Sequence, residues 1–321
     1  MEALFTDSVL GTLAILWLVV VLDFIWRWPS AYHPLTLLRL MASSMAKKVL
    51  PAKQDPAMQH YISGALGPVV IITPFAVLLG LLVYIAEYPL FFEAVLMLAL
   101  VDFNHIRFQY KRVVAAVGKN KKVLTRETLT PIVYRDCEKL TDIGIAKAAI
   151  ESLVLRFCYQ YWGVLFWFLL AGPVTALVYR MLLTINWEWH WRKPGYLRFS
   201  QPVHNLTKAM RAIPAFIASL ALILVTHPIK SFTAMINAKA RDQSSLILAV
   251  IGGGHDIKLG GPAFYHGQKY RYPRVGGQRD VRYSDMIYCQ RAITRASLLL
   301  ATLSTLLLLA LWESPRVPGL Y

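Results

Sequence analysis

The sequence predicts an all-α, polytopic helical membrane protein with five or six membrane-embedded segments, some of them re-entrant if the chain folds back within the bilayer. Hydrophobic residues make up 56% of the 321 residues and charged residues only 16%, and the mean hydropathy is +0.47. A soluble domain carries about a quarter charged residues. A soluble fold could not bury this much apolar surface, so we expect one integral membrane domain over residues 1–321.

Six apolar segments are candidates for insertion into the membrane. They are residues 9–26, 64–86, 90–101 (continuing to about 108), 157–183, 212–226 and 293–312. The second is close to the roughly 20 residues that a helix needs to cross a bilayer. Two of the others are suspect, because 157–183 is interrupted by Gly172 and Pro173, and 212–226 is short and contains Pro214.

The excess of basic residues predicts an orientation in the membrane. Lys and Arg number 34 against 18 Asp and Glu, a net charge of +16. In a membrane protein such an excess is typical of cytoplasmic loops that face anionic lipid, so we expect the bilayer as partner and not nucleic acid. Residues 102–156 and 227–292 are the predicted cytoplasmic loops of a multi-pass membrane protein.

Polar residues beside the apolar segments are candidates for a site. Asp23 lies near the end of the first segment and His33 follows it. A charge there costs a few kcal/mol unless it is paired or hydrated, which allows either a site or a helix end in headgroup water. Arg135 and Asp136 open a predicted amphipathic helix over residues 135–157, and Glu151 lies near its membrane end, where an ordinary surface ion pair is the alternative.

The second polar stretch is rich in glycine, arginine and tyrosine. Residues 259–267 imitate a phosphate-binding loop, but no Gly-Lys-Ser/Thr follows, so we interpret them and Gly252–Gly254 as turns. A basic cluster interleaved with tyrosines follows, which could grip an anion or RNA, although contact with lipid headgroups is favoured. Its members are Lys269, Arg271, Arg274, Arg279 and Arg282, with Tyr265, Tyr270, Tyr272 and Tyr283. The tryptophans of residues 187–191 are typical of an interfacial aromatic belt. The three cysteines are odd in number and far apart, so no metal site is predicted.

Taken in order, these residues resemble a known family. The shared features are Asp23, Pro29, His33 with Pro34, Arg135 with Asp136, Glu151, residues 259–262, Tyr265, Gly267, Pro273, Gly276 and residues 278–280. The order is similar to that of the CobD/CbiB family of cobalamin-biosynthesis membrane proteins, from about residue 10 to 310. The resemblance implies adenosylcobinamide-phosphate synthase activity, which joins an aminopropanol, usually as its phosphate, to a corrinoid carboxylate with nucleoside triphosphate hydrolysis. It implies Mg-nucleotide and corrinoid only if that activity is retained.

The chain departs from the family pattern where polar chemistry is expected. After Glu151 the family has Glu-Asn and then Asp-Gly. Here those positions read Leu155-Arg156 and Tyr159-Gln160. Two aspartates and an asparagine before the Pro-Ala pair are replaced by Thr207, Lys208 and Arg211, and the Ser-Pro-Asn segment near residues 241–244 is not reproduced. The positive replacements would turn carboxylate coordination of Mg²⁺ into repulsion. Such a divergent paralogue also resembles AmpE-type proteins, which are linked to sensing of cell-wall state.

Two functions therefore stand as hypotheses. One is a non-catalytic scaffold or sensor, a pseudoenzyme on the family's fold, which the missing acids favour; the other is an active amide ligase like the family's synthase. A homo-oligomer is compatible with either. For any retained ligand site we expect a positive cavity that takes an anionic small molecule or a lipid headgroup. Its candidate residues are Asp23, His33, Arg135, Asp136, Glu151, Arg156, Lys208, Arg211, Tyr265, Arg279 and Asp280.

The segment 157–183 carries the sharpest structural prediction. A full crossing would place Arg156 and Lys208 on opposite sides of the membrane, although the family positions they occupy should meet in one site. A proline removes a backbone donor and a glycine permits a turn, so Gly172 and Pro173 can break the segment. We therefore predict two half-helices, 157–171 and 174–183, that form a re-entrant hairpin, with a kinked full crossing as the alternative. Residues 212–226 would then dip in as well.

Overall fold

The computed structural model describes residues 8–29, 32–119, 121–138 and 140–313, most of which are helical. The first half contains α2 (Ser8–Ile25), α3 (Pro34–Val49), α4 (Ala57–Ile85), α5 (Pro89–Val101), α6 (Phe103–Gly118), α7 (Lys122–Leu129), the 3₁₀ turn η2 (Thr130–Ile132) and α8 (Asp142–Arg156). The second half contains the π-helical turn η3 (Phe157–Tyr161), α9 (Trp162–Glu188), α10 (Gln201–Val225), α11 (Pro228–Ile236), α12 (Gln243–Gly254), the strands β1 (Lys258–Gly260), β2 (Ala263–Tyr265), β3 (Gln268–Tyr270) and β4 (Arg274–Gly276), and α13 (Tyr283–Glu313).

The predicted class, a polytopic helical membrane protein, is confirmed. Five described stretches are helical, long and apolar enough to cross a membrane: Ala57–Ile85, Pro89–Gly118, Asp142–Glu188, Gln201–Val225 and Tyr283–Trp312. Each of the six predicted segments contains a helix, although α2 is shorter than these five. Large side chains on α4, including Leu66, Val70 and Leu78, are more than half exposed. An outward-facing apolar surface of this kind fits a lipid environment.

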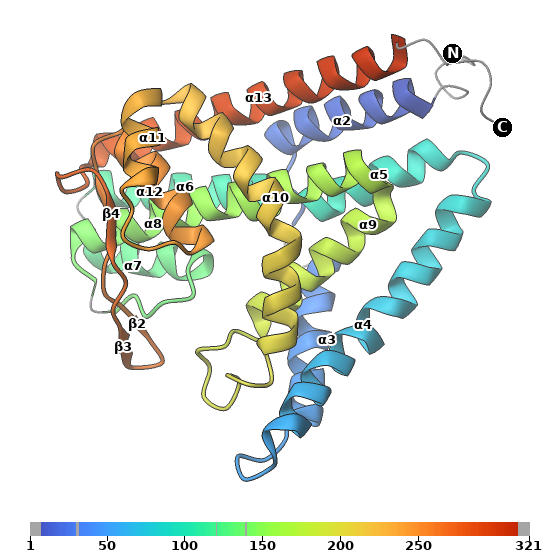
Figure 1. The fold of residues 1–321 in the computed structure, drawn as a ribbon, viewed down its shortest axis with the longest axis horizontal. Coiled ribbons are helices and arrows are strands. Elements are labelled where there is room, and N and C mark those ends of the chain that lie inside the picture. Colours follow the sequence, from blue (N-terminus) through green and yellow to red (C-terminus); the bar gives the residue numbers. More distant parts are fainter. Residues whose placement is uncertain (1–7, 30–31, 120, 139, 314–321) are drawn as a thin grey trace.

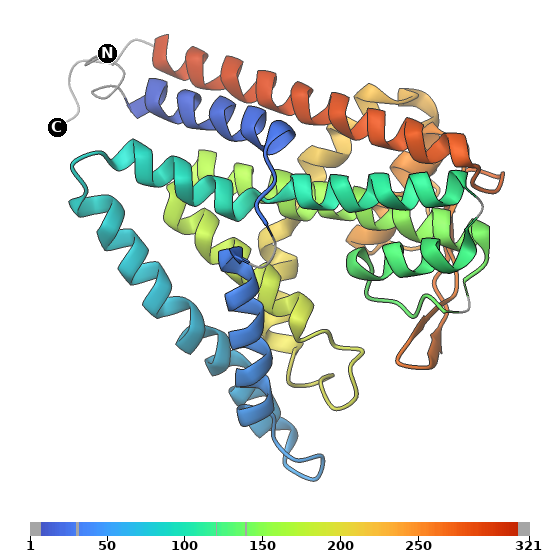
Figure 2. The same ribbon diagram turned by 180° about the vertical axis from the view of Figure 1, so that it is seen from behind.

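The helices form two groups that diverge from one end of the molecule. In Figures 1 and 2, α13, α2 and the α5–α6 pair run in similar directions, while α3 and α4 extend away at an angle. The indole of Trp17 donates to Thr305 Oγ1 at 3.0 Å and ties α2 to α13. The α7, α8, α11 and α12 helices and the strands gather at the end far from where α13 terminates, and α10 runs across the other helices (Figure 1).

The predicted amphipathic helix at 135–157 begins later than its pattern suggests. It starts at Asp142, with Thr141 as N-cap: the Thr141 hydroxyl accepts from the Gly144 amide at 3.2 Å. Arg135 and Asp136 therefore do not open this helix but lie in the segment before it, which corrects the prediction. The helix is buried on most of its circumference, since nine of its residues are in the interior. The 102–156 stretch as a whole is mostly helical rather than an open loop.

The predicted break at Gly172 and Pro173 is confirmed. Ala171 (φ −143°, ψ 17°) and Gly172 (φ 79°, ψ −178°) leave the helical conformation inside α9. The two halves then fold back on each other. The hydroxyl of Tyr179, after the break, donates to the carbonyl of Tyr159, before it, at 2.6 Å. The chain from α8 to the end of α9 is thus a helical hairpin, visible in Figure 1 as the turn of α9 near α5.

Residues 212–226 belong to a longer helix than the hydropathy indicated. The α10 helix begins at Gln201 and continues through Pro214 to Val225, so it is long enough to cross a membrane by length and composition. The predicted segment is too short, because the first half of α10 carries polar side chains that hydropathy does not count as membrane-embedded. After α11 the chain returns to this helix: the side-chain Nε2 of Gln243 donates to the carbonyl of Lys208 at 3.0 Å.

The glycine-rich region 252–277 is folded rather than a series of open turns. Residues 252–254 end α12, and a side chain at Gly253 would lie 2.3 Å from Ala234 of α11, so glycine permits the two helices to touch. The strands form two short antiparallel pairs. Leu259 pairs with Val275 in the β1–β4 pair, and Phe264 pairs with Lys269 in the β2–β3 hairpin.

Candidate functional site

A cavity of about 450 Å³ lies between the helical hairpin, α10, α12 and the strands. Ala148, Glu151 and Ser152 of α8 form part of its wall, as do Lys208 and Arg211 of α10. Gly260 and Tyr265 contribute from the strands. The remaining wall comes from residues 132–135, from the end of α9 and the loop after it, and from the start of α12.

Six of the predicted site residues line this cavity. They are Arg135, Glu151, Arg156, Lys208, Arg211 and Tyr265. Arg156 and Lys208 thus meet in one place, as the hairpin prediction required. The other five, Asp23, His33, Asp136, Arg279 and Asp280, are absent from the cavity lining.

Glu151 forms a buried ion pair rather than a surface one. Its side chain is 3% exposed, one carboxylate oxygen pairs with the guanidinium of Arg135, and the other accepts from the Gly260 amide at 2.7 Å. Burial alone would lower the pKa of Arg135, but the charge of Glu151 and its hydrogen bond, together with the neighbouring Tyr265 and Cys137, outweigh burial and raise that pKa above its usual value. This carboxylate therefore holds β1 and the segment before α8 against the cavity wall.

Arg156 and Arg211, where departures from the family pattern are expected from the sequence, lie at the same cavity. Arg156 is buried, and its guanidinium lies 4.6 Å from the ring centre of Trp187. Arg211 lies 4.4 Å from the ring centre of Tyr159 and donates to Gln243 at 2.8 Å. These contacts are cation–π interactions and a hydrogen bond to a neutral acceptor, so they bring no carboxylate to either guanidinium.

Aromatic rings cover another part of the wall. The imidazole of His190 stacks between Tyr134 and Tyr265, with ring centres 6.0 and 5.7 Å apart. Arg192 lies over the rings of Trp191, Tyr265, Tyr270 and Tyr272, at distances between 4.2 and 5.1 Å. Burial and the charges of Arg192 and Lys193 lower the pKa of His190 to about 3, so this ring is neutral at pH 7.

The cavity wall is positively charged. Arg135, Arg156, Arg192, Lys208 and Arg211 line it, against the two carboxylates of Glu151 and Asp242. Asp242 is also engaged, because it caps α12 by accepting from the Ser245 amide at 3.1 Å. Within the described ranges no three His, Cys, Asp or Glu side chains gather where they could hold a metal ion. Since Mg²⁺ prefers oxygen ligands with negative charge, this set of groups does not suit a Mg-nucleotide.

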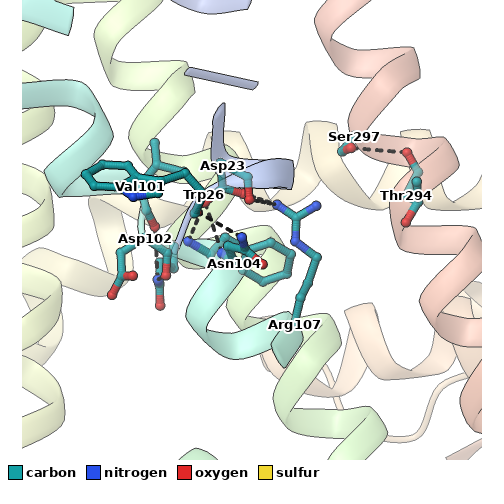
Figure 3. Close-up of polar contacts among 10 residues, drawn as sticks. Asp23, Trp26, Val101, Asp102, Asn104, Arg107, Thr294 and Ser297 are labelled. Atoms are coloured by element: carbon teal, nitrogen blue, oxygen red, sulfur yellow. Dashed lines mark hydrogen bonds and ion pairs between the residues drawn. The ribbon is translucent and has the colours of Figure 1, made fainter. Parts of the chain in front are cut away.

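Asp23 stabilises the fold away from the cavity. Its carboxylate accepts from the amides of Phe103 and Asn104 at 2.8 and 3.0 Å and pairs with Arg107 (Figure 3). It is buried, so the alternative of a carboxylate in headgroup water does not describe it. His33 caps α3 in a similar way, since its Nδ1 accepts from the Leu35 amide at 3.1 Å.

The three remaining candidates form contacts near the strands. Asp136 accepts from the amides of His266 and Gly267 at 3.3 and 2.9 Å, which fixes the hairpin that carries Tyr265. Arg279 makes a bidentate pair with Asp285, at 2.7 and 2.6 Å, and this hydrogen bonding raises the pKa of Arg279. Asp280 is exposed, and its carbonyl accepts from Arg279 at 3.4 Å.

Several cavity residues were not predicted from the sequence. The sequence pattern of residues 187–191 predicts an interfacial aromatic belt. In the structure, Trp187, His190 and Trp191 line the cavity instead. The neighbouring Trp189 is fully buried against Gly67. A usable signal was present in α10. His204, Lys208 and Arg211 follow helical spacing of four and three residues, which places them on one face.

Comparison with known protein families agrees with this architecture. The model of the family described as CobD/Cbib protein matches residues 16–293. The chain belongs to the CobD/CbiB family. Among its relatives are the cobalamin biosynthesis proteins CobD of Chromobacterium violaceum, 24% identical over 89% of this chain and 94% of the relative, and of Stutzerimonas stutzeri, 26% identical over 84% and 86%. That of Sinorhizobium fredii is 30% identical over 64% of this chain and 66% of its own.

No solved structure matches this CobD/CbiB family member. Nearly the full length of the Chromobacterium violaceum CobD is covered, so the family relation extends over the hairpin, α10 and the strands alike. Arg156, Tyr159, Lys208 and Arg211, at which departures from the family pattern are expected from the sequence, fall within the matched residues and line the cavity.

Proposed function

We propose that this CobD/CbiB family member is a non-catalytic scaffold or sensor of the bacterial inner membrane whose cavity binds an anionic ligand. The cavity belongs on the cytoplasmic side, because the basic 102–156 and 227–292 regions contribute to its wall and positive residues are retained on that side. The protein acts by holding its ligand or responding to it, as a membrane receptor does.

One observation carries this proposal: five Lys and Arg side chains line the cavity against two carboxylates, and both carboxylates are engaged in structural hydrogen bonds. A ligase that uses a nucleotide needs negatively charged or amide oxygens to hold its metal and to polarise the reacting carboxylate. The positive wall instead attracts anions, and its electrostatic field is strongest where the walls exclude water.

Genetic complementation tests the proposal. In a bacterial strain that lacks the synthase, expression of this chain should not restore growth that depends on formation of cobinamide phosphate. The matched control is the Chromobacterium violaceum CobD expressed from the same vector and checked for equal membrane levels. Growth supported by this chain would refute the non-catalytic proposal.

The second candidate is an active amide ligase that joins an aminopropanol or its phosphate to a corrinoid carboxylate. The match over residues 16–293 favours it, because the scaffold of proteins named for cobalamin biosynthesis is retained. Gene neighbourhood discriminates between the two candidates. Neighbouring corrinoid genes support the ligase, and neighbouring cell-wall genes support the sensor.

A further inference from the structure

Arg180, in the second half of the hairpin, is a buried cation with incomplete hydrogen bonding. Its side chain is 0% exposed, and its Nε donates to the carbonyl of Leu100 at 2.8 Å. Its Nη1 and Nη2 atoms have no hydrogen-bond partner among the described residues. Buried polar groups in native proteins are nearly always hydrogen-bonded, so a guanidinium with two free nitrogens requires an explanation.

Trp187 connects Arg180 to the cavity. The guanidinium of Arg180 lies 5.4 Å from the centre of the Trp187 ring, and that of Arg156 lies 4.6 Å from it. Arg156 and Trp187 both line the cavity, whereas Arg180 does not. Two buried guanidinium groups therefore lie over one indole ring, and one of them, that of Arg156, lines the cavity.

Negative charge near this pair is scarce. Arg39, Arg156 and Arg180 all interact electrostatically with Asp102, which is the carboxylate they share. Asp102 also lies 3.6 Å from the Nε2 of His33. Three guanidinium groups thus face one carboxylate in a region where charges are costly to bury without partners. Any anion that reaches this part of the cavity wall gains from this imbalance.

We propose that the inner end of the cavity, at Arg156 and Trp187, is a subsite for a phosphate-type oxyanion, with Arg180 adding positive charge from behind the indole. The planar fork of a guanidinium matches the oxygens of a phosphate group and forms strong charge-assisted hydrogen bonds with it. Arg156 makes the direct contact, and Arg180 acts through its charge and through Trp187. This inference rests on the proposed anionic ligand and names its anchoring group. A soluble phosphate compound and a lipid headgroup both carry this group.

Thermal unfolding of the full chain in lipid nanodiscs tests the subsite, because a ligand that binds only the folded state raises Tm. One arm uses neutral phosphatidylcholine discs and adds inorganic phosphate at constant ionic strength. The other arm uses discs that contain phosphatidylglycerol, without added phosphate. A saturating rise in Tm in the first arm identifies a soluble anion. A higher Tm in the second arm than in neutral discs, together with no response to phosphate in the first arm, identifies a lipid headgroup.

Two variants locate the response. Arg156→Gln should weaken the apparent affinity by about tenfold or more, as expected for the loss of one charged hydrogen-bonding partner. Arg180→Gln should also weaken it, although this variant without ligand should unfold at or above the Tm of the wild type, because an unpaired buried charge is removed. If Arg180 were only structural, its variant would unfold earlier and keep the full response.

The remaining outcomes separate this inference from the proposed function. Lys121→Gln, an exposed change outside the cavity, controls for net charge and should respond like the wild type. If Lys208→Gln and Arg211→Gln abolish the response while Arg156→Gln and Arg180→Gln retain it, the inner subsite is wrong and the anionic ligand stands. If the wild type responds in neither arm, the proposed anionic ligand fails together with the subsite.

Discussion

Buried charges in this chain are of two kinds at the scale of single residues. Asp23, Glu151 and Asp285 are fully engaged, each with one arginine and with at least one backbone amide. Arg156 and Arg180 form no ion pair with a carboxylate among the residues that the structure describes. Groups of the first kind fix one element to another, and groups of the second kind leave positive charge available to a ligand. The distinction separates structural candidates from binding candidates.

Asp23→Asn should destabilise the fold without altering the cavity. The change leaves Arg107 as an unpaired buried cation, and breaking a buried ion pair in this way costs about 3–5 kcal/mol. Thermal unfolding in neutral nanodiscs measures the loss, and the phosphate response should be retained. Glu87→Gln, an exposed change on the turn before α5, is the control and should unfold like the wild type. An equally small effect of both changes would contradict the structural role.

Glu151→Gln should both destabilise the protein and loosen the strands at the cavity. The variant removes the charge that pairs with Arg135, and an amide can keep only part of the contact to Gly260. Hydrogen exchange should therefore quicken at the amides of residues 258–260 more than elsewhere. The exposed acid Glu127 provides the control as Glu127→Gln. Unchanged protection at residues 258–260 would show that Glu151 does not hold β1.

At the scale of elements, apolar runs predicted the membrane helices well and their ends poorly. The α4 and α13 helices each contain a long, mostly apolar stretch, which is a strong signal at about 20 residues. The α10 helix was shortened in the prediction because His204 and Lys208 face a polar cavity. The pair between Arg135 and Glu151 joins residues 16 apart across a turn, and no local pattern indicates such a contact. Hydropathy reports only the average environment of a segment.

Gly172→Ala should destabilise the hairpin through the backbone alone. Gly172 has φ 79° and ψ −178°, a conformation that is essentially restricted to glycine, and an added Cβ would meet nothing within 4 Å. We expect a loss of about 1–3 kcal/mol, the cost of holding a residue in such a region. Gly80→Ala in α4 is the matched control, because its Cβ would make an ordinary contact of 3.5 Å in a regular helix. Equal Tm values for the two variants would mean that the break is not strained.

At the scale of the whole molecule, the path of the chain places the polar elements together. The α9 helix ends close to where α8 ends, since Arg156 of α8 lies against Trp187 of α9. The chain also returns after α10 and α11, where Arg211 and the Lys208 carbonyl bond to Gln243. The cavity lies where these two returns meet, and α10 runs across the helices that flank it (Figure 1). Both returns predict that the flanking segments share one side of the membrane.

Labelling of single introduced cysteines from each side of the membrane tests this topology. Three exposed positions are suitable: Lys121→Cys before α7, Arg198→Cys between α9 and α10, and Lys239→Cys after α11. All three cysteines should react from the cytoplasmic side. Glu87→Cys, between α4 and α5, should react from the opposite side, and the native cysteines are buried. Reaction of Lys121→Cys and Arg198→Cys from opposite sides would require a full crossing by the hairpin. Reaction of Arg198→Cys and Lys239→Cys from opposite sides would require the same of α10, and either result would contradict the shared cytoplasmic cavity.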